Sequence, residues 1–309
     1  MSNSEENVTY TLYAWTGQRR RNIPFAREQF DAVQVARERL VFGLVFEQRI
    51  DIALENFAEL EKCILDMALR NALFRGESDE RLRQGRHVVN RYLANFMSSG
   101  KLYVDQTSHA LSGFFGEKSI ERSDFLISTN TEYDNCFGYR VFEALRNYSQ
   151  HRGLPTHSLA FSAKREEEEG SATRICNVVS FGLKPKSLRE DGKFKRAILD
   201  ELDAKVDKNG VVALMPLARD YISGLARIHE TCRERIKGWI SEADQTVFDT
   251  VNMAKDENGE PAWLLQAAKN LPDRSQVTEY VNLKPVEERK RYEQKNRSAA
   301  HISSQYVVS

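Results

Sequence analysis

The stretch AREQFDAVQVARERLVFGLVFEQRIDIALENFAELEKCILDMALRNALF, residues 26–74, decides the fold class of this chain. It contains no proline, and from Phe30 to Met67 its apolar side chains recur mostly at steps of three and four residues. This spacing predicts an amphipathic helix that buries one face. Because the stretch exceeds the usual length of a helix, we expect either one very long helix or two helices that meet near Gly43.

The same helical spacing recurs further along the chain. Beyond residues 26–74, the stretches that favour helix are 79–97, 132–152, 193–206, 216–240, 242–254 and 263–268. The apolar residues of 216–240 step by three and four in a pattern close to a heptad seam. We expect a turn over residues 98–106 and a mixed segment that could hold a short helix over 106–130.

Strand patterns occur in two regions. Residues 8–15 are β-branched and aromatic and favour a short strand, followed by a basic turn over 17–25. Residues 157–164 and 173–183 favour two further strands. The acidic segment between them, 165–172, favours a solvated hairpin tip, so we expect a β-hairpin within a largely helical chain.

Together these patterns predict a mainly α chain, with an up-and-down helical bundle, a β-hairpin insertion and additional C-terminal helices. The segment after Pro285 is charged and poor in large apolar residues, which favours a helical or disordered tail. The predicted organisation is an N-terminal segment over 1–25, the bundle over 26–155, the β-hairpin over 156–192, a C-terminal helical region over 193–284 and a charged tail over 285–309.

The composition limits the function classes that fit. The 309 residues carry 45 Lys+Arg and 45 Asp+Glu, so no global field draws the chain to a polyanion, and any such contact must be local. No apolar run approaches the roughly 20 residues that span a bilayer, and the first ten residues lack a signal peptide's features. The four cysteines lie far apart, which indicates reduced thiols. We therefore expect a cytoplasmic protein without a membrane partner.

Several common site motifs are missing from the sequence. There is no GxxxxGK[ST] loop, no strand followed by GxGxxG, no GxSxG elbow, no HExxH and no DxDxDG loop. The cysteines form no CxxC pair and no paired His/Cys spacing of a structural zinc site. We therefore expect neither a cofactor nor a metal ion.

One short segment, EALRNYSQHRGLP at residues 143–155, gathers polar groups of different chemistry. On a helix, Asn147 and His151 share a face, and Arg146 lies at its edge. Arginine is a permanent cation suited to phosphate oxygens, and histidine can exchange a proton near neutral pH. Gly153 suits the left-handed residue that ends a helix, and Pro155 blocks continuation. The same residues also suit an ordinary helix end, where they favour the helix dipole.

The residues Arg146–Asn147–Tyr148–Ser149–Gln150–His151 resemble the signature of the HEPN superfamily, in which an arginine and a polar residue precede a histidine near the end of a late bundle helix. The resemblance covers about residues 25–155 and implies a HEPN-like bundle. It implies an endoribonuclease in which His151 is the acid or base, Arg146 steadies the phosphate and Asn147 assists. The basic residues expected to contact RNA are Arg152, Arg81, Arg83 and Arg86.

The resemblance also implies partners. These are an RNA substrate, a second copy of the chain with the motif at the interface, and an antitoxin or defence-system protein. RNA cleavage would then proceed without a metal, by attack of a 2′-hydroxyl on the adjacent phosphate. Two alternatives stay open, namely a helical scaffold that uses residues 216–240 as its partner surface and a bundle that binds nucleotide without cleaving.

Overall fold

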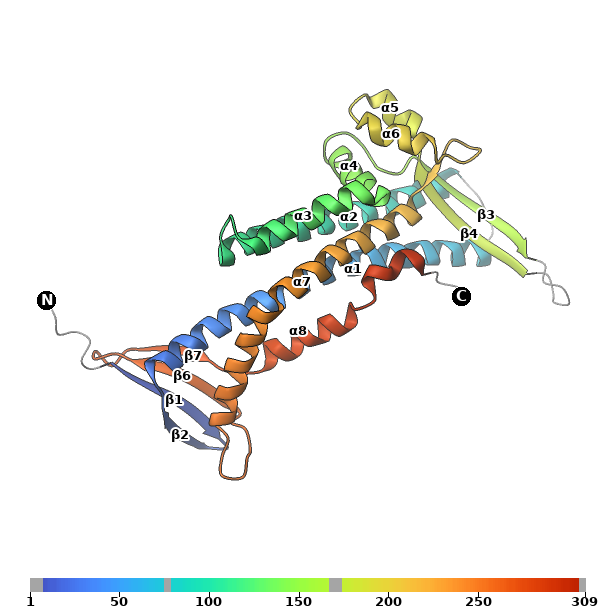
Figure 1. Cartoon of the computed structure of the whole chain (residues 1–309). Helices are drawn as coiled ribbons and strands as arrows, with labels where there is room; N and C mark the ends of the chain where they lie inside the picture. The colour runs from blue at the N-terminus through green and yellow to red at the C-terminus, as the bar shows by residue number, and fades with distance from the viewer. Residues whose placement is uncertain (1–7, 75–78, 167–173, 306–309) are drawn as a thin grey trace. The chain divides into compact units, whose positions relative to one another are not determined.

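A computed structural model describes residues 8–74, 79–166 and 174–305 of the chain. The chain is mainly helical, with two small antiparallel sheets (Figure 1), so the expected mainly α class is confirmed. The acidic hairpin tip predicted over 165–172 lies almost wholly outside the described residues.

The chain forms two compact units that each combine distant parts of the sequence. Unit 1 comprises Met1–Gln48 and Arg233–Asn296, and unit 2 comprises Arg49–Cys232 and Arg297–Ser309. The two longest helices, α1 (residues 27–73) and α7 (residues 214–253), contribute residues to both units. The unit boundaries after Gln48 and after Cys232 therefore fall inside helices, where composition and turn residues give no signal.

Unit 1 is a four-stranded antiparallel sheet with helices packed on it. The strand order is β2-β1-β6-β7, so the two N-terminal strands pair with strands from near the other end of the chain. Its elements besides parts of α1 and α7 are β1 (Thr9–Thr16), β2 (Arg19–Pro24), β6 (Leu264–Asn270), β7 (Gln276–Tyr280) and α8 (Lys284–Lys295). Alternate strand residues such as Leu12, Ala14 and Leu265 are buried against Phe30 and Val33 of α1.

The long stretch that decides the fold class is one helix, α1 (Arg27–Leu73), and the alternative of two helices meeting near Gly43 is wrong. A Cβ on Gly43 would lie 2.9 Å from Ile240 Cδ1 and 3.1 Å from Arg289 Cδ. The glycine thus permits the close approach of α7 and α8 inside unit 1. Four residues later, the buried Glu47 carboxylate accepts hydrogen bonds of 2.8 and 2.7 Å from the Arg233 guanidinium.

Unit 2 is a set of long helices with a second sheet. Its strands form the order β3-β4-β5, with β3 and β4 making the predicted hairpin. Besides parts of α1 and α7, its elements are α2 (Asp79–Phe115), α3 (Ile120–Asn135), α4 (Phe137–His151), β3 (Ser158–Glu166), β4 (Arg174–Leu183), α5 (Pro185–Asp191), α6 (Arg196–Asp203), β5 (Val212–Ala213) and a 3-10 helix, η1 (Ala299–Ser304).

Aromatic rings from four helices fill the centre of unit 2. The Tyr221 ring of α7 stacks on Phe142 of α4 at 5.1 Å between centroids and meets Phe96 of α2 edge-on at 5.5 Å. Phe57 of α1 contacts Phe96 at 5.5 Å. Aromatic pairs in these geometries contribute about 0.5–1.5 kcal/mol beyond the burial of their area, so this cluster fixes how the helices of unit 2 face one another.

Glycines in α2 and α4 allow both helices to approach α7 closely. A Cβ on Gly100 would lie 2.5 Å from the Tyr221 hydroxyl oxygen, and a Cβ on Gly138 would lie 2.6 Å from the Leu217 carbonyl oxygen and 2.5 Å from Asp220 Cβ. Backbone atoms cannot move aside as the end of a side chain can. Gly138 therefore sets the distance between α4 and α7.

Some predicted elements are corrected by the structure. The turn expected over 98–106 is the middle of α2, because Gly100 serves packing rather than a bend. The helix expected over 263–268 is strand β6, which has sheet partners on both sides. The basic turn expected over 17–25 is only the tip of a hairpin, since β2 pairs with β1 from Arg19 onward.

Further corrections concern helix ends and the tail. The predicted helix over 132–152 is divided at Cys136, and residues 242–254 continue α7 rather than forming a separate helix. The C-terminal region expected to be helical over 193–284 also contains three strands. Within the tail expected over 285–309, α8 and η1 are ordered, and η1 packs Ala299 and Ala300 against Ala226.

We predict opposite effects for two glycine-to-alanine changes in the helices of unit 2. Gly138→Ala places a methyl group against the backbone of α7 and should lower the free energy of unfolding by roughly 1–3 kcal/mol. Gly113→Ala, near the end of α2, meets no atom within 4 Å and should raise it by up to about 1 kcal/mol through helix propensity. Urea unfolding of both variants measures the difference, and equal effects would contradict the close approach at Gly138.

Candidate functional site

The motif segment lies on α4, whose apolar side chains point into unit 2. Phe142 and Leu145 are fully buried, so the opposite side of α4 faces outward. Asn147 and His151 are exposed, and Arg146 is half-buried. The predicted arrangement of these three residues at the end of one helix is therefore present.

Arg146 and Asn147 contact each other directly. Arg146 Nη1 donates a 3.2 Å hydrogen bond to Asn147 Oδ1. The Nε of Arg146 is buried and has no hydrogen-bond partner among the residues that the structure describes. The asparagine thus orients one arm of the guanidinium.

Glu143 is a member of this cluster that the sequence interpretation missed. Glu143, Asn147 and His151 follow one another at steps of four, so they form a single stripe along α4. Burial raises the pKa of the Glu143 carboxyl and Asp105 adds to the rise, while the charges of Lys101 and Arg146 oppose it. The spacing of four residues was the signal that could have found it.

His151 occupies the last turn of α4, with its ring in solvent. Across the described ranges, no hydrogen bond or ion pair joins its side chain to another residue. The helix ends when the Arg152 N–H donates a 2.8 Å bond to the Tyr148 carbonyl. The prediction that Gly153 adopts the left-handed conformation is wrong, because the change of direction occurs at Arg152, with φ −135° and ψ −59°.

The chain that leaves α4 is held against α2. The buried Thr156 N–H donates a 2.9 Å hydrogen bond to Asn90 Oδ1. The next residue, His157, faces the Tyr148 ring at 6.5 Å between centroids, and Tyr148 also meets Phe194 edge-on at 6.1 Å. These contacts fix where the first strand of the hairpin begins relative to the motif helix.

A basic pocket, lined by Arg83, Arg86, His157 and Lys184, lies where the hairpin meets α2. Its volume is about 370 Å³, and Asp79 is the acidic residue in its lining. Two of the four residues predicted to contact RNA, Arg83 and Arg86, thus lie together in a concave site.

The other two predicted RNA-contacting residues lie elsewhere. Arg81 stacks over the Phe161 ring at 5.6 Å and donates a 2.9 Å hydrogen bond to the Phe74 carbonyl, so it ties α2 to the hairpin and to the end of α1. Arg152 is exposed beside His151 at the end of α4. Any RNA contact of Arg152 would therefore be made beside the motif and not in the basic pocket.

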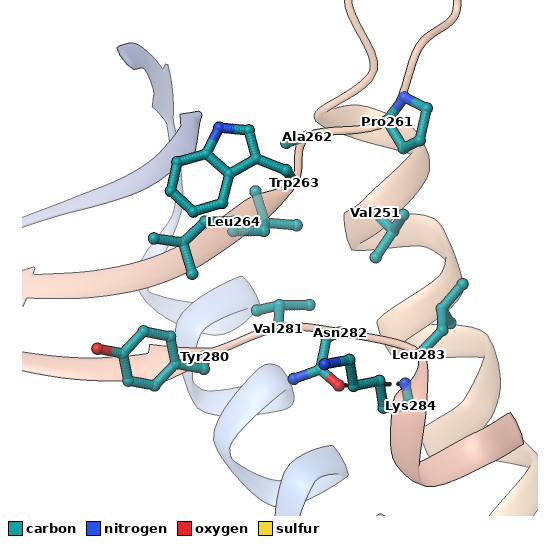
Figure 2. Close-up of a pocket in the computed structure, with 11 residues that line it drawn as sticks. Val251, Pro261, Ala262, Trp263, Leu264, Tyr280, Val281, Asn282, Leu283 and Lys284 are labelled. Atoms are coloured by element: carbon teal, nitrogen blue, oxygen red, sulfur yellow. Dashed lines mark hydrogen bonds between the residues drawn. The ribbon is translucent and has the colours of Figure 1, made fainter. Parts of the chain in front are cut away.

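Unit 1 has a cavity of about 330 Å³ between the sheet and α7, and its lining is largely apolar. Figure 2 shows the side chains around it, with Trp263 before β6, Tyr280 at the end of β7 and Val251 from α7. Trp263 and Tyr280 are 67% and 52% exposed. The cavity contains no cluster of acid, base and cation comparable to that of α4.

The described residues contain no group of three or more His, Cys, Asp or Glu side chains placed to hold a metal ion. None of the helices in the described ranges is long and apolar enough to cross a bilayer.

A scan against models of protein families, a search of curated proteins and a search of solved structures each found no match.

We predict that Glu143→Gln changes stability in a pH-dependent way. The folded chain holds the proton of Glu143 to a higher pH than the unfolded chain, whose carboxyl has a pKa near 4.5. Between the two pKa values the folded state binds more protons, so the stability that this group contributes falls as pH rises. Glutamine cannot ionise, and the variant should gain stability relative to the parent as pH increases from about 4 to about 7.

Urea unfolding midpoints across this pH range measure the effect. The exposed Glu117→Gln, in the loop between α2 and α3, controls for the loss of one negative charge. A difference between Glu143→Gln and the parent that is constant with pH would show that Glu143 is not perturbed by burial.

Proposed function

We propose that this chain is a metal-independent endoribonuclease whose reacting groups lie at the end of α4. The observation that carries the proposal is the joint placement of a hydrogen-bonded Arg146–Asn147 pair and an exposed His151 on one short helix. The basic pocket near the same helix end supports it, because it offers local positive charge on a chain without net charge. The resemblance to the HEPN superfamily supplies the reaction class.

In this proposal His151 exchanges the proton of the RNA 2′-hydroxyl or of the leaving oxygen, since its exposed ring can reach a substrate and an imidazole can both accept and donate a proton. Arg146 stabilises the charge that develops on the phosphate, because a guanidinium matches phosphate oxygens and cannot lose its proton. Asn147 holds the guanidinium through its 3.2 Å hydrogen bond. Cleavage yields a 2′,3′-cyclic phosphate and a 5′-hydroxyl end.

One histidine cannot act as acid and base in the same step, so we propose that a second copy of the chain supplies the other. Asn147 and His151 are exposed at the end of α4 and are accessible to such a copy. A homodimer with both motifs at the interface would place two histidines on either side of one phosphate. An antitoxin or defence-system partner that covers this surface would control the activity.

A second candidate function is protein binding through unit 1. It is favoured by the exposed Trp263 and Tyr280 beside an apolar cavity, because these residue types dominate the energetic centres of protein interfaces. This function would place the activity of the chain far from α4 in sequence and would leave RNA intact.

We predict that the purified chain cleaves single-stranded RNA in excess chelator and that His151→Ala lowers the rate by about 10²–10⁴-fold, the usual contribution of a general acid or base. Arg146→Ala should lower the rate by a similar factor through loss of charge stabilisation. Gln150→Ala is the matched control, because Gln150 is an exposed polar residue in the same turn. The products are read by gel electrophoresis and mass spectrometry.

The structure makes these variants informative. His151 and Gln150 are both exposed, so their replacement should change the free energy of unfolding by less than about 0.5 kcal/mol. Absence of cleavage by the parent chain would reject the enzyme function. Equal cleavage by the parent and His151→Ala would reject the site on α4.

A further inference from the structure

The basic pocket gathers more positive than negative charge. Among the side chains that the structure describes, no carboxylate lies within ion-pair distance of Arg83, Arg86 or Lys184. Asp79 is the acidic group in the lining. Like charges held at one concave site repel each other, so a bound anion would relieve this repulsion.

A neutral hydrogen-bond donor completes the lining. Burial lowers the pKa of the His157 imidazole, and the charges of Lys184 and Arg86 lower it further, so the ring is neutral at physiological pH. His157 Nδ1 accepts a long, 3.5 Å hydrogen bond from the Lys184 backbone N–H. Because Nδ1 accepts, the proton is on Nε2, which is then a donor toward a ligand.

The position of the hairpin strand on α2 forms the pocket. A Cβ on Gly85, which lies between the two arginines in sequence, would be 2.8 Å from Leu159 Cδ2. The glycine therefore allows β3 to approach α2 at the turn that carries Arg83 and Arg86. The two arginines are three residues apart and share a helix face, which brings both to the same side of the strand.

We propose that the basic pocket binds a phosphate monoester, the terminal phosphate of a nucleotide or of an RNA chain. Three cations and a neutral donor suit a group with about two negative charges, and an internal phosphodiester carries only one. The volume of about 370 Å³ is within the range of small-molecule sites. A concave site also favours a terminal group, because an internal phosphate continues into the chain on both sides.

Phosphate binding in the basic pocket does not depend on cleavage at His151. Two kinds of ligand carry such a phosphate, namely a free mononucleotide and the end of an RNA strand. The two ligands differ in size, because an RNA end carries further nucleotides that must leave the pocket along the protein surface. Probes of each kind therefore distinguish the two ligands.

The test measures equilibrium binding of two phosphorylated probes, each with its unphosphorylated counterpart, to the full chain. They are a nucleoside 5′-monophosphate and a short 2′-O-methyl RNA with either a 5′-phosphate or a 5′-hydroxyl, whose blocked 2′ positions prevent cleavage. We expect at least one phosphorylated probe to bind about tenfold or more tightly than its unphosphorylated counterpart, with the nucleoside as counterpart of the mononucleotide. Arg83→Ala and Arg86→Ala should each weaken that binding by on the order of tenfold.

The control variant is Arg91→Ala, which removes an exposed cation from the same helix outside the pocket and should leave the phosphate preference unchanged. Because Arg83 and Arg86 are also exposed, all three variants should keep the unfolding midpoint of the parent. Equal affinity with and without phosphate would overturn the proposal. A phosphate preference that survives in the Arg83→Ala, Arg86→Ala double variant would overturn it as well.

Discussion

The close approach of α4 to α7 is the constraint on which the candidate site depends. Gly138 lies directly against the α7 backbone at Leu217, and one turn later the Phe142 ring stacks on Tyr221. These two contacts fix both the distance and the rotation of α4, because a backbone clash limits the first and ring stacking the second. Once the rotation is fixed, the residues opposite Phe142 must face solvent, and Asn147 and His151 are among them.

The rotation of α4 also buries the side chain of Glu143, which is unfavourable for its ionised form. This residue lies on the same stripe as Asn147 and His151 but one turn nearer the core. An apolar residue would be more stable at such a position. In the proposed function, a phosphate near the Arg146 guanidinium would favour the protonated form of the Glu143 carboxyl. The candidate site thus lies where helix packing and charge solvation conflict.

The sequence predicted the elements whose signal is local. The periodic stretch of α1, the hairpin strands and the end of α4 all follow from apolar spacing, turn residues and their flanks. The misplaced elements depend on distant partners. In the sequence Gly100 favours a turn, and only the structure shows that the Tyr221 hydroxyl packs against it. The residues of β6 favour a helix in the sequence, and only their pairing with β1 and β7 makes them a strand. For the same reason the pairing of chain ends in unit 1 could not be predicted.

The same distinction between local signals and distant partners applies to the candidate site. Arg146, Asn147 and His151 share one helix, so the spacing could place them, whereas His157 and Lys184 reach the basic pocket only because β4 folds back on β3. His157 follows His151 by six positions in the chain, which limits the distance between their Cα atoms to at most about 22 Å. The hydrogen bond from Thr156 to Asn90 keeps this short connection on α2. A phosphate bound in the pocket would therefore hold the following few nucleotides of its strand within reach of α4, so the two proposed sites are compatible with a single RNA end.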